Sequence, residues 1–351
     1  MPSAHLTQLR KWFMESPPIE WGINQLRELL IGSLSQGPVP QHIAFVMDGN
    51  RRFARLHQIE TVEGHHMGFE ALARILEICY KSGVRVVTVY AFSIENFKRS
   101  KYEVDALMEM AKIKLSQLSQ HGELLERYGA CIRVLGQKKL VKPDVLQAIQ
   151  EAEDLTKNNG DCVLNICFPY TSRDEITTAI RKTVEDYCKP LSAPARPFSQ
   201  RRISQKIRSK YIVKNTARPD SPTPSSKTGF DDTKIPSAIP RNEPETPPTD
   251  SDILIYPDPE KIDSLALDNH MFTANNPPVA LLIRTSGVKR LSDFMLWQCH
   301  ENTEIVFLDC LWPEFDLWSF LPVLIEWQWK QKQLGENAFD HAATLSKYKV
   351  K

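Results

Sequence analysis

The residues with the clearest chemical meaning in this chain form a short polar run directly after the apolar run Ile43–Met47. The polar run reads Asp48-Gly49-Asn50-Arg51-Arg52. A strand that turns through a glycine into a helix exposes backbone N–H groups, and these groups bind anions together with the helix dipole. Glycine lets a ligand approach the backbone closely, and arginines offer forked donors to phosphate oxygens.

Asp48 indicates what kind of anion site this is. A carboxylate repels a phosphate unless a metal ion lies between them, and Mg²⁺ prefers one or two carboxylates together with phosphate oxygens. The run therefore predicts a magnesium-dependent diphosphate site. The alternative is an aspartate that only caps the next helix, beside arginines on the surface.

A second polar cluster follows the apolar run Arg85–Phe92. Ser93, Asn96 and Arg99 offer a hydroxyl, an amide and a guanidinium, with the aromatic ring of Phe97 among them. Polar residues at the carboxyl end of a parallel strand are typical of open α/β active sites. This mixture suits a ligand that has a charged head and an apolar body.

A third cluster follows the apolar run that ends at Arg284. Arg284, Arg290 and Ser292 surround a glycine turn and form a second candidate anion-binding loop. Two such loops predict two phosphorylated substrates, or one substrate with two phosphorylated ends. His65 and His66 lie in a glycine-flanked turn and are a weaker signal, because a lone histidine is more often structural than catalytic.

Several common sites are missing from the sequence. There is no GxxxxGK[ST] loop, no GxGxxG after a strand, no HExxH and no GxSxG. The DDxxD motif of the all-helical prenyl-chain synthases is also absent, because Asp231-Asp232 lacks the later aspartate. A phosphatase of the haloacid dehalogenase type needs an Asp-x-Asp pair, but Val46 and Asp48 occupy those positions.

Six short runs of branched and aromatic residues must position these clusters. They are hydrophobic almost throughout, as expected of parallel strands that are covered on both faces. The expected strands are Ile43–Met47, Arg85–Phe92, Cys131–Leu135, Cys162–Phe168, Val279–Arg284 and Ile305–Leu308. Helical patterns lie between them, so the sequence predicts an α/β fold with a mostly parallel six-stranded sheet flanked by helices.

The predicted catalytic domain covers residues 38–188 and 252–335. Residues 189–251 interrupt it with a segment rich in proline, serine and threonine, which is expected to be a disordered insertion. Residues 1–37 carry the helical stripe Ile23, Leu26, Leu30 and Leu34. This stripe predicts an amphipathic helix that lies on a membrane or near the mouth of a lipid site, or one that packs on its own domain or on a partner subunit. Residues 336–351 are expected to form a C-terminal tail.

Composition narrows the classes of function. The net charge of +1 provides no general attraction to nucleic acid, so no nucleic-acid partner is expected. No apolar run approaches the ~20 residues that span a bilayer, so the sequence favours a protein that is at most peripheral to a membrane. The seven cysteines are scattered, which favours a reducing compartment.

Together these clusters resemble the cis-prenyltransferase family, the undecaprenyl and dehydrodolichyl diphosphate synthases, and the details resemble its eukaryotic, fungal members. The resemblance covers about residues 20–180 and 252–330. Its motifs are long and specific: MDGNRR from Met47, YAFSIENFKRS from Tyr90, and IRTSG-x-x-R-x-S-D-F-x-x-WQ from Ile283.

The resemblance implies that isopentenyl diphosphate is added repeatedly, with cis geometry, to farnesyl diphosphate. It implies that Asp48 coordinates Mg²⁺, that Ser93 and Asn96 lie near the reacting carbons, and that Asn96 relays the proton. It also implies two sets of binding residues. The allylic diphosphate is bound by Gly49, Asn50, Arg51, Arg52, Phe53, His65, Phe97 and Arg99, and isopentenyl diphosphate by Arg284, Arg290 and Ser292.

The chain departs from bacterial members in two places. They carry an arginine four residues before the GH pair, where this chain has Thr61. They also carry a metal-binding glutamate after the WQ motif, where Glu301 and Glu304 both lie nearby; Glu304 is selected here. Apolar faces such as Leu72/Ile75/Leu76 and Leu107/Met108/Ala111 are candidates to line a tunnel for the growing chain, although such stripes are more often core.

Homodimeric members end in an Arg-x-Gly motif that reaches the partner's active site, and residues 337–351 lack one. The resemblance therefore implies a heteromer with an accessory subunit of the Nogo-B-receptor type. It also implies dolichol synthesis for protein glycosylation on the cytosolic face of the endoplasmic reticulum membrane, or on lipid droplets. A rival reading is the non-catalytic subunit itself, but such a subunit is expected to lack Asp48 and the phosphate-binding arginines.

Overall fold

The computed structural model describes residues 17–120, 127–190, 208 and 256–348, with side chains described for 21–117, 127–190, 208 and 256–334. Contacts between Cα atoms divide the chain into two compact units, residues 1–180 with 267–351, and residues 181–266. Of the predicted insertion 189–251, all but Lys189, Pro190 and Arg208 lie outside the described residues. The first sixteen residues of the predicted N-terminal segment lie outside them as well.

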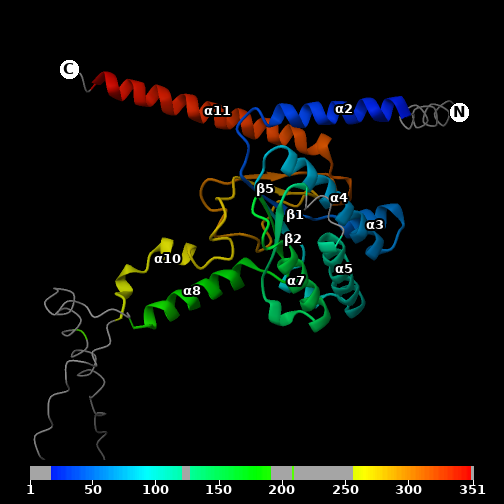
Figure 1. The fold of residues 1–351 in the computed structure, drawn as a ribbon, viewed down its shortest axis with the longest axis horizontal. Coiled ribbons are helices and arrows are strands. Elements are labelled where there is room, and N and C mark those ends of the chain that lie inside the picture. Colours follow the sequence, from blue (N-terminus) through cyan, green and yellow to red (C-terminus); the bar gives the residue numbers. More distant parts are fainter. Residues whose placement is uncertain (1–16, 121–126, 191–207, 209–255, 349–351) are drawn as a thin grey trace, which may run out of the picture. The chain divides into compact units, whose positions relative to one another are not determined.

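A six-stranded sheet forms the centre of the first unit (Figure 1), with the strand order β3-β4-β2-β1-β5-β6. All five pairings are parallel. The strands are β1 (His42–Val46), β2 (Val86–Tyr90), β3 (Ala130–Leu135), β4 (Cys162–Cys167), β5 (Leu281–Arg284) and β6 (Glu304–Phe307). The predicted α/β class and all six predicted strands are confirmed, with ends that differ by one or two residues.

Alternate residues of a strand point to opposite faces of a sheet, and both faces of this sheet are buried. Ile43 and Phe45 of β1 belong to a large core, whereas Ala44 and Val46 belong to a smaller core on the opposite face. This two-sided burial explains why the strands are hydrophobic at nearly every position.

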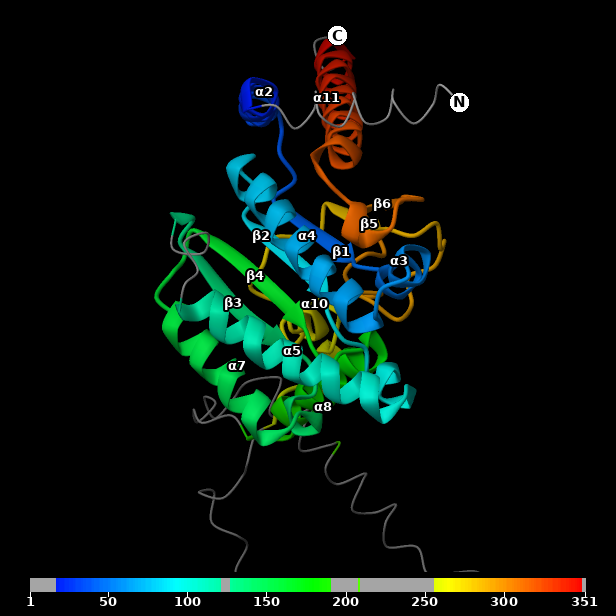
Figure 2. The ribbon, with the colours of Figure 1, turned by 90° about the vertical axis from the view of Figure 1, so that its right-hand side faces the viewer.

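The large core lies beneath several helices (Figure 2). Those that contribute are α2 (Pro17–Leu34), α4 (Thr61–Lys81), α5 (Lys101–Gln120), α7 (Pro143–Thr156), the short turn Trp312–Glu314, and α11 (Leu317–Tyr348). The smaller core lies beneath the segment that contains Phe294, Met295 and Cys299. Two other helices, α8 (Ser172–Cys188) and α10 (Ser264–Asp268), each run into the second compact unit.

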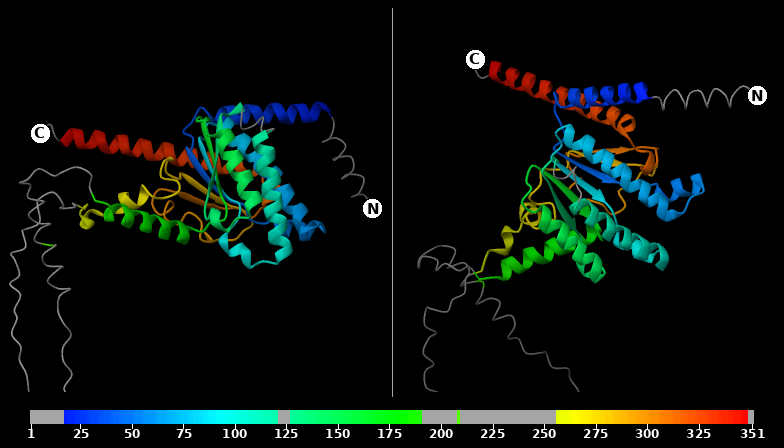
Figure 3. Two further views of the ribbon diagram at one scale, coloured as in Figure 1. Left: turned by 60° about the horizontal axis from the view of Figure 1, so that its bottom comes forward. Right: turned by 45° about the vertical axis from the view of Figure 1, so that its right-hand side comes forward.

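Helix α2 (Pro17–Leu34) confirms the helix predicted near the N-terminus, but it buries a different set of side chains from the predicted stripe. Ile31 and Leu34 are buried, while Trp21, Leu26 and Leu29 are exposed. Helix α11 runs alongside α2 (Figure 3), and Gln328 Nε2 donates to the Leu34 carbonyl at 2.7 Å. The α11 backbone continues as far as Tyr348, through most of the residues expected to form the C-terminal tail. None of the described helices is both long and apolar enough to cross a bilayer.

A buried polar chain crosses the middle of the sheet and joins β4, β2 and β1. The Asn165 amide donates to the Thr88 hydroxyl at 3.0 Å, and this hydroxyl lies 2.7 Å from His42 Nε2. His42 Nδ1 lies 2.8 Å from the Pro277 carbonyl. A carbonyl can only accept, so Nδ1 carries the proton and Nε2 accepts from Thr88. Burial lowers the pKa of His42 to about 4.

We expect this histidine to make the fold less stable in mild acid. At pH above 6.5, His42 is neutral in both the folded and the unfolded chain. As the pH falls from 6.5 towards 4, the unfolded chain binds a proton that the folded chain does not, so at pH 5 the free energy of unfolding falls by about 2 kcal/mol. Urea unfolding at pH 7.5 and pH 5 measures this loss, and His42→Gln should lose correspondingly less between the two pH values. An equal loss in both proteins would contradict the assignment.

Candidate active site

The predicted polar clusters meet at one edge of the sheet, at the carboxyl ends of neighbouring strands. β1 lies between β2 and β5. Asp48 comes two residues after β1, the short helical turn Ile94–Lys98 follows β2, and Arg284 is the last residue of β5. Because the three strands are parallel, residues far apart in the sequence reach the same place.

Arg284 joins the first and third clusters directly. It is 3 % exposed, and its Nη2 donates to Asp48 Oδ2 at 2.7 Å. Its Nη1 donates to Ser292 Oγ at 2.6 Å and to the carbonyl of Arg290. Arg290 Nε also donates to Ser292 Oγ, at 3.1 Å. The two predicted anion loops are therefore two sides of one continuous site.

Hydrogen bonds with the segment after β5 hold both Asp48 and the helix that follows it. The Thr285 hydroxyl donates to the Asp48 carbonyl at 2.7 Å, and Arg52 Nη1 donates to the Ser286 carbonyl at 2.9 Å. Burial acts to raise the pKa of Asp48, but the hydrogen bond and charge of Arg284, with the charge of Arg52, outweigh it and lower that pKa below its usual value. Asp48 is therefore ionised at neutral pH.

A turn at Gly49 leads from Asp48 into α3 (Asn50–His57). Gly49 has φ 116°, which favours glycine, and a Cβ atom there would lie 3.1 Å from the backbone of Leu311. Helix α4 approaches this turn through Gly68, where a Cβ atom would lie 2.5 Å from Asn50 Oδ1. Asn50 Oδ1 is buried and has no hydrogen-bond partner among the described residues, so this turn holds an acceptor that the protein leaves unpaired.

Glu103 is a site residue that the sequence reasoning missed. Its carboxylate accepts from Arg99 Nη1 at 2.8 Å and lies 4.0 Å from Arg51 Nε and 3.9 Å from His65 Nε2. Arg99 Nη2 in turn donates to Asn96 Oδ1 at 2.9 Å. A carboxylate four residues after Arg99 in a helical segment was the only signal available in the sequence.

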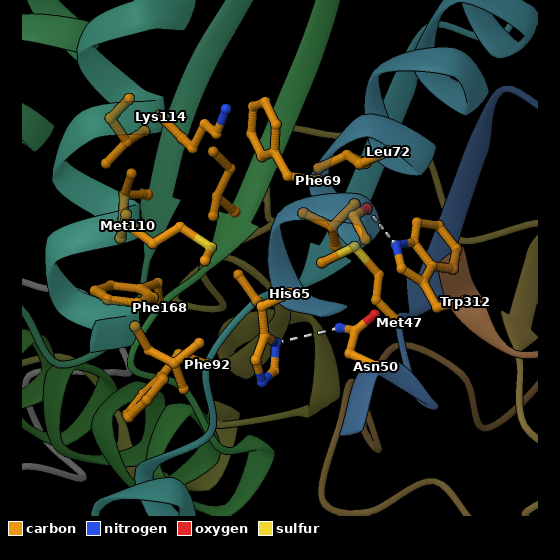
Figure 4. A pocket seen from close by; sticks show the side chains of 18 residues that line it. Met47, Asn50, His65, Phe69, Leu72, Phe92, Met110, Lys114, Phe168 and Trp312 are labelled. Atoms are coloured by element: carbon orange, nitrogen blue, oxygen red, sulfur yellow. Dashed lines mark hydrogen bonds between the residues drawn. The ribbon is translucent and has the colours of Figure 1, made fainter. Parts of the chain in front are cut away.

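His65 is neutral near pH 7. Burial, followed by the positive charge of Arg99, lowers its pKa to about 4, although Glu103 opposes this shift. Its Nδ1 lies 3.4 Å from Asn50 Nδ2, so the pair joins α4 to the turn after Asp48 (Figure 4).

Ser93, Phe97 and Phe53, also predicted as site residues, differ in their contacts and in their exposure. The Ser93 hydroxyl accepts from the Glu95 N–H at 3.2 Å and so begins the Ile94–Lys98 turn. The Phe97 ring lies edge-on to Phe92, with a centroid distance of 5.0 Å, and remains partly exposed. The Phe53 ring, by contrast, is buried and stacks on His57 at 4.0 Å. Its stacking partner is thus a residue of α3 itself.

Glu304 does not lie with these residues. It is the first residue of β6 and pairs with Leu281, whereas Arg284, at the site edge, pairs with Phe307. Its carboxylate forms an ion pair with Lys330 of α11 at 2.6 Å. The selection of Glu304 as a metal ligand therefore conflicts with its position, three residues back along the strand from the site.

The remaining donors fit a magnesium ion that is shared with a ligand. Among the described residues, no three His, Cys, Asp or Glu side chains form a complete metal cage. Mg²⁺ at substrate phosphates commonly uses only one or two protein carboxylates. An ionised Asp48 beside the guanidinium groups of Arg284 and Arg52 matches that pattern.

A mostly apolar cavity of about 140 Å³ begins beside Asn50 and His65 (Figure 4). Its walls come from β2, β3 and β4, from helices α4 and α5, from Met47 directly after β1, and from Trp312. The predicted lining residues Leu72, Leu107 and Ala111 face it, whereas Ile75, Leu76 and Met108 belong to the core. Lys114, also on α5, lines the cavity as well. Its ammonium lies 4.9 Å from the centre of the Phe69 ring.

A charged edge with an apolar cavity behind it suits a diphosphate that carries a hydrocarbon chain, and the comparisons with known proteins agree. The family model "Putative undecaprenyl diphosphate synthase" matches residues 46–335. The chain belongs to the cis-prenyltransferase family. It is therefore an enzyme that elongates prenyl chains, in a family that is generally magnesium-dependent.

Relatives among characterised cis-prenyltransferases cover most of the chain. A dehydrodolichyl diphosphate synthase complex subunit of Schizosaccharomyces pombe is 42 % identical over 91 % of this chain and 97 % of its own length. The human subunit of the same name is 37 % identical over 84 % of this chain and 69 % of its own.

A solved structure supports the same fold. Lavandulyl diphosphate synthase from Lavandula x intermedia, in complex with dimethylallyl diphosphate, aligns with a TM-score of 0.57 at 24 % identity, covering 83 % of this chain and 95 % of the other.

Proposed function

We propose that this chain is the catalytic subunit of a dehydrodolichyl diphosphate synthase complex that adds isopentenyl diphosphate repeatedly to farnesyl diphosphate. The observation that carries the proposal is the hydrogen-bonded group of Asp48, Arg284 and Ser292, which unites two anion-binding loops beside an apolar cavity. Relatives named as subunits of this synthase complex support the choice of product.

The allylic diphosphate binds at the Asp48–Arg52 turn. Backbone N–H groups at the start of α3 and the side chains of Arg51, Arg52 and Arg99 contact its oxygens. Its hydrocarbon tail enters the cavity past Asn50 and His65. Mg²⁺, held by Asp48, would neutralise charge on the departing pyrophosphate.

Isopentenyl diphosphate binds on the β5 side, where Arg284, Arg290 and Ser292 hold its diphosphate. The allylic C–O bond breaks and its electron pair leaves with pyrophosphate, while a new C–C bond forms to isopentenyl diphosphate, which then loses a proton. Arg52 and Arg99 stabilise the leaving group electrostatically. Holding both substrates at one sheet edge supplies much of the remaining rate enhancement.

Asn96 and Ser93 lie on the segment after β2 that borders the allylic side. Arg99 fixes the orientation of the Asn96 amide, which suits a group that passes on the proton lost from isopentenyl diphosphate. His65 is neutral at pH 7 and donates or accepts a hydrogen bond without adding charge.

The active unit is a heteromer with an accessory subunit of the Nogo-B-receptor type, at the cytosolic face of the endoplasmic reticulum membrane. The names of the relatives as complex subunits support a heteromer. The exposed Trp21 and Leu29 on α2 support a contact with a lipid or protein surface.

Incubation of the complex with labelled isopentenyl diphosphate, farnesyl diphosphate and Mg²⁺ tests this function. We expect long polyprenyl diphosphates, resolved by length on reversed-phase plates, and no elongation in EDTA. The chain without the accessory subunit serves as the comparison. No elongation by the full complex would contradict the function, and equal activity of the isolated chain would contradict the heteromer.

A further inference from the structure

The loop that presents Ser292 has an unusual backbone. Ser292, Asp293 and Met295 have φ values of 53°, 61° and 47°, all in the left-handed region and none of them glycine. Such residues are strained unless their surroundings hold them in place, although aspartate tolerates this conformation better than most. A loop with this backbone needs support from outside itself.

The beginning of α8 supplies that support. The Ser172 N–H donates to the Asp293 carbonyl at 2.7 Å, and the Arg173 N–H donates to Asp293 Oδ1 at 3.0 Å. Arg173 Nε donates to Asp293 Oδ2 at 2.8 Å. The first N–H groups of a helix have no partner within the helix and carry partial positive charge. Asp293 therefore acts as a cap for α8 that comes from a distant part of the chain.

The other side of the loop is fixed as well. The Leu296 N–H donates to Ser172 Oγ at 2.9 Å. The Phe294 ring is fully buried and stacks on Tyr90, with a centroid distance of 4.7 Å. Asp293 itself is only 14 % exposed in its side chain. The loop is therefore held between α8 and the smaller core.

The Asp293 carboxylate contacts the first turn of α8, whereas its neighbour Ser292 lies among the arginines of the site. Ser292 Oγ accepts from both Arg284 and Arg290. A shift of the loop backbone at residue 293 would move this hydroxyl and the Arg290 carbonyl, which also accepts from Arg284. The orientation of both arginines thus depends on a contact made outside the site.

We propose that Asp293 is a positioning residue for isopentenyl diphosphate, acting through the backbone of its loop on Ser292 and Arg290. The inference rests on the proposed function, because it takes Arg284, Arg290 and Ser292 to bind that substrate. It predicts that a change at Asp293 raises the KM for isopentenyl diphosphate more than the KM for farnesyl diphosphate, because the allylic side is built from segments after β1 and β2.

The test uses the complex with its accessory subunit and the variants Asp293→Gly and Asp293→Asn. Glycine relieves the left-handed strain but removes every side-chain hydrogen bond, so we expect the KM for isopentenyl diphosphate to rise about tenfold. The KM for farnesyl diphosphate should change less than about twofold. Asparagine keeps an oxygen that accepts from the Arg173 N–H and should restore the KM to within about threefold of wild type.

Two further variants sharpen the comparison. Ser172→Ala removes the hydrogen bond from the Leu296 N–H and leaves the Asp293 carboxylate in place, so we expect a smaller rise in the same KM. This variant tests the loop even if Asp293→Gly does not fold. Asp174 also lies in the first turn of α8, but its carboxylate accepts a hydrogen bond from Gln137 Nε2. The second variant is therefore Asp174→Ala. It serves as the matched control, with both KM values unchanged.

Wild-type KM for isopentenyl diphosphate in Asp293→Gly, or in Ser172→Ala where the glycine variant does not fold, would overturn the inference. Equal rises in both KM values, together with a lower Tm, would also overturn it, because they would show a general structural role. Failure of the wild-type complex to elongate at all would instead contradict the proposed function, so the two failures are distinguishable.

Discussion

Replacing Asp48 with alanine is expected to lower kcat for chain elongation about a thousandfold, the scale seen when a group that stabilises transition-state charge is removed. Two effects combine here. The variant loses the proposed magnesium ligand, and it leaves the buried guanidinium of Arg284 without its carboxylate partner. Elongation of labelled isopentenyl diphosphate by the complex, at saturating concentrations of both substrates, measures the effect.

Asp48→Asn separates these two effects. Its amide oxygen still accepts from Arg284, so the free energy of unfolding should stay closer to wild type than in Asp48→Ala, where an unpaired buried charge costs several kcal/mol. Its neutral side chain is a poor magnesium ligand, so elongation should remain low. An Asp48→Asn complex with activity close to wild type would show that the carboxylate is dispensable.

Replacing Arg284 with lysine is expected to lower kcat/KM for isopentenyl diphosphate about a hundredfold, although the charge is retained. The guanidinium contacts Asp48, Ser292 and the Arg290 carbonyl at once. A single ammonium cannot reproduce this planar fork. Initial rates with each substrate varied in turn measure the effect, and the KM for isopentenyl diphosphate should rise most.

Arg133→Lys is the matched control for that substitution. Arg133 also lies on a strand, β3, and donates to Asn276 at 3.3 Å, away from the proposed site. Its replacement should leave both KM values unchanged. A comparable loss in both variants would indicate that any strand arginine is needed for folding, and not that Arg284 recognises the diphosphate.

The six strands could be predicted because each is a run rich in branched apolar residues, and the fold buries the central strands β1, β2 and β5 on both faces. The polar residues after those strands could be predicted as site residues for the same reason, since parallel strands end at a common edge. What the sequence could not provide was the strand order. β5 is a neighbour of β1 although more than 230 residues separate Arg284 from Asp48, so the two anion loops looked like separate sites.

The errors and omissions also arise from three-dimensional neighbours. Glu304 was chosen by its distance from a motif, but its place at the start of β6 puts it away from the site edge. Phe53 follows the phosphate-binding turn, yet the helical period turns its ring towards His57. Glu103 and Asp293 were missed because the groups that reveal their positions come from distant segments, Arg51 and His65 for Glu103 and the start of α8 for Asp293.

The strand residues that line the cavity come from β2, β3 and β4, on one side of β1 in the strand order, whereas β5 lies on the other side. In the proposed reaction, each new five-carbon unit arrives on the β5 side. Growth is then processive in a fixed direction: the newest unit carries the diphosphate, crosses β1 to the allylic position, and pushes the older units deeper beneath α5. The different positions of the cavity and the isopentenyl diphosphate loop relative to β1 thus set the direction of chain growth.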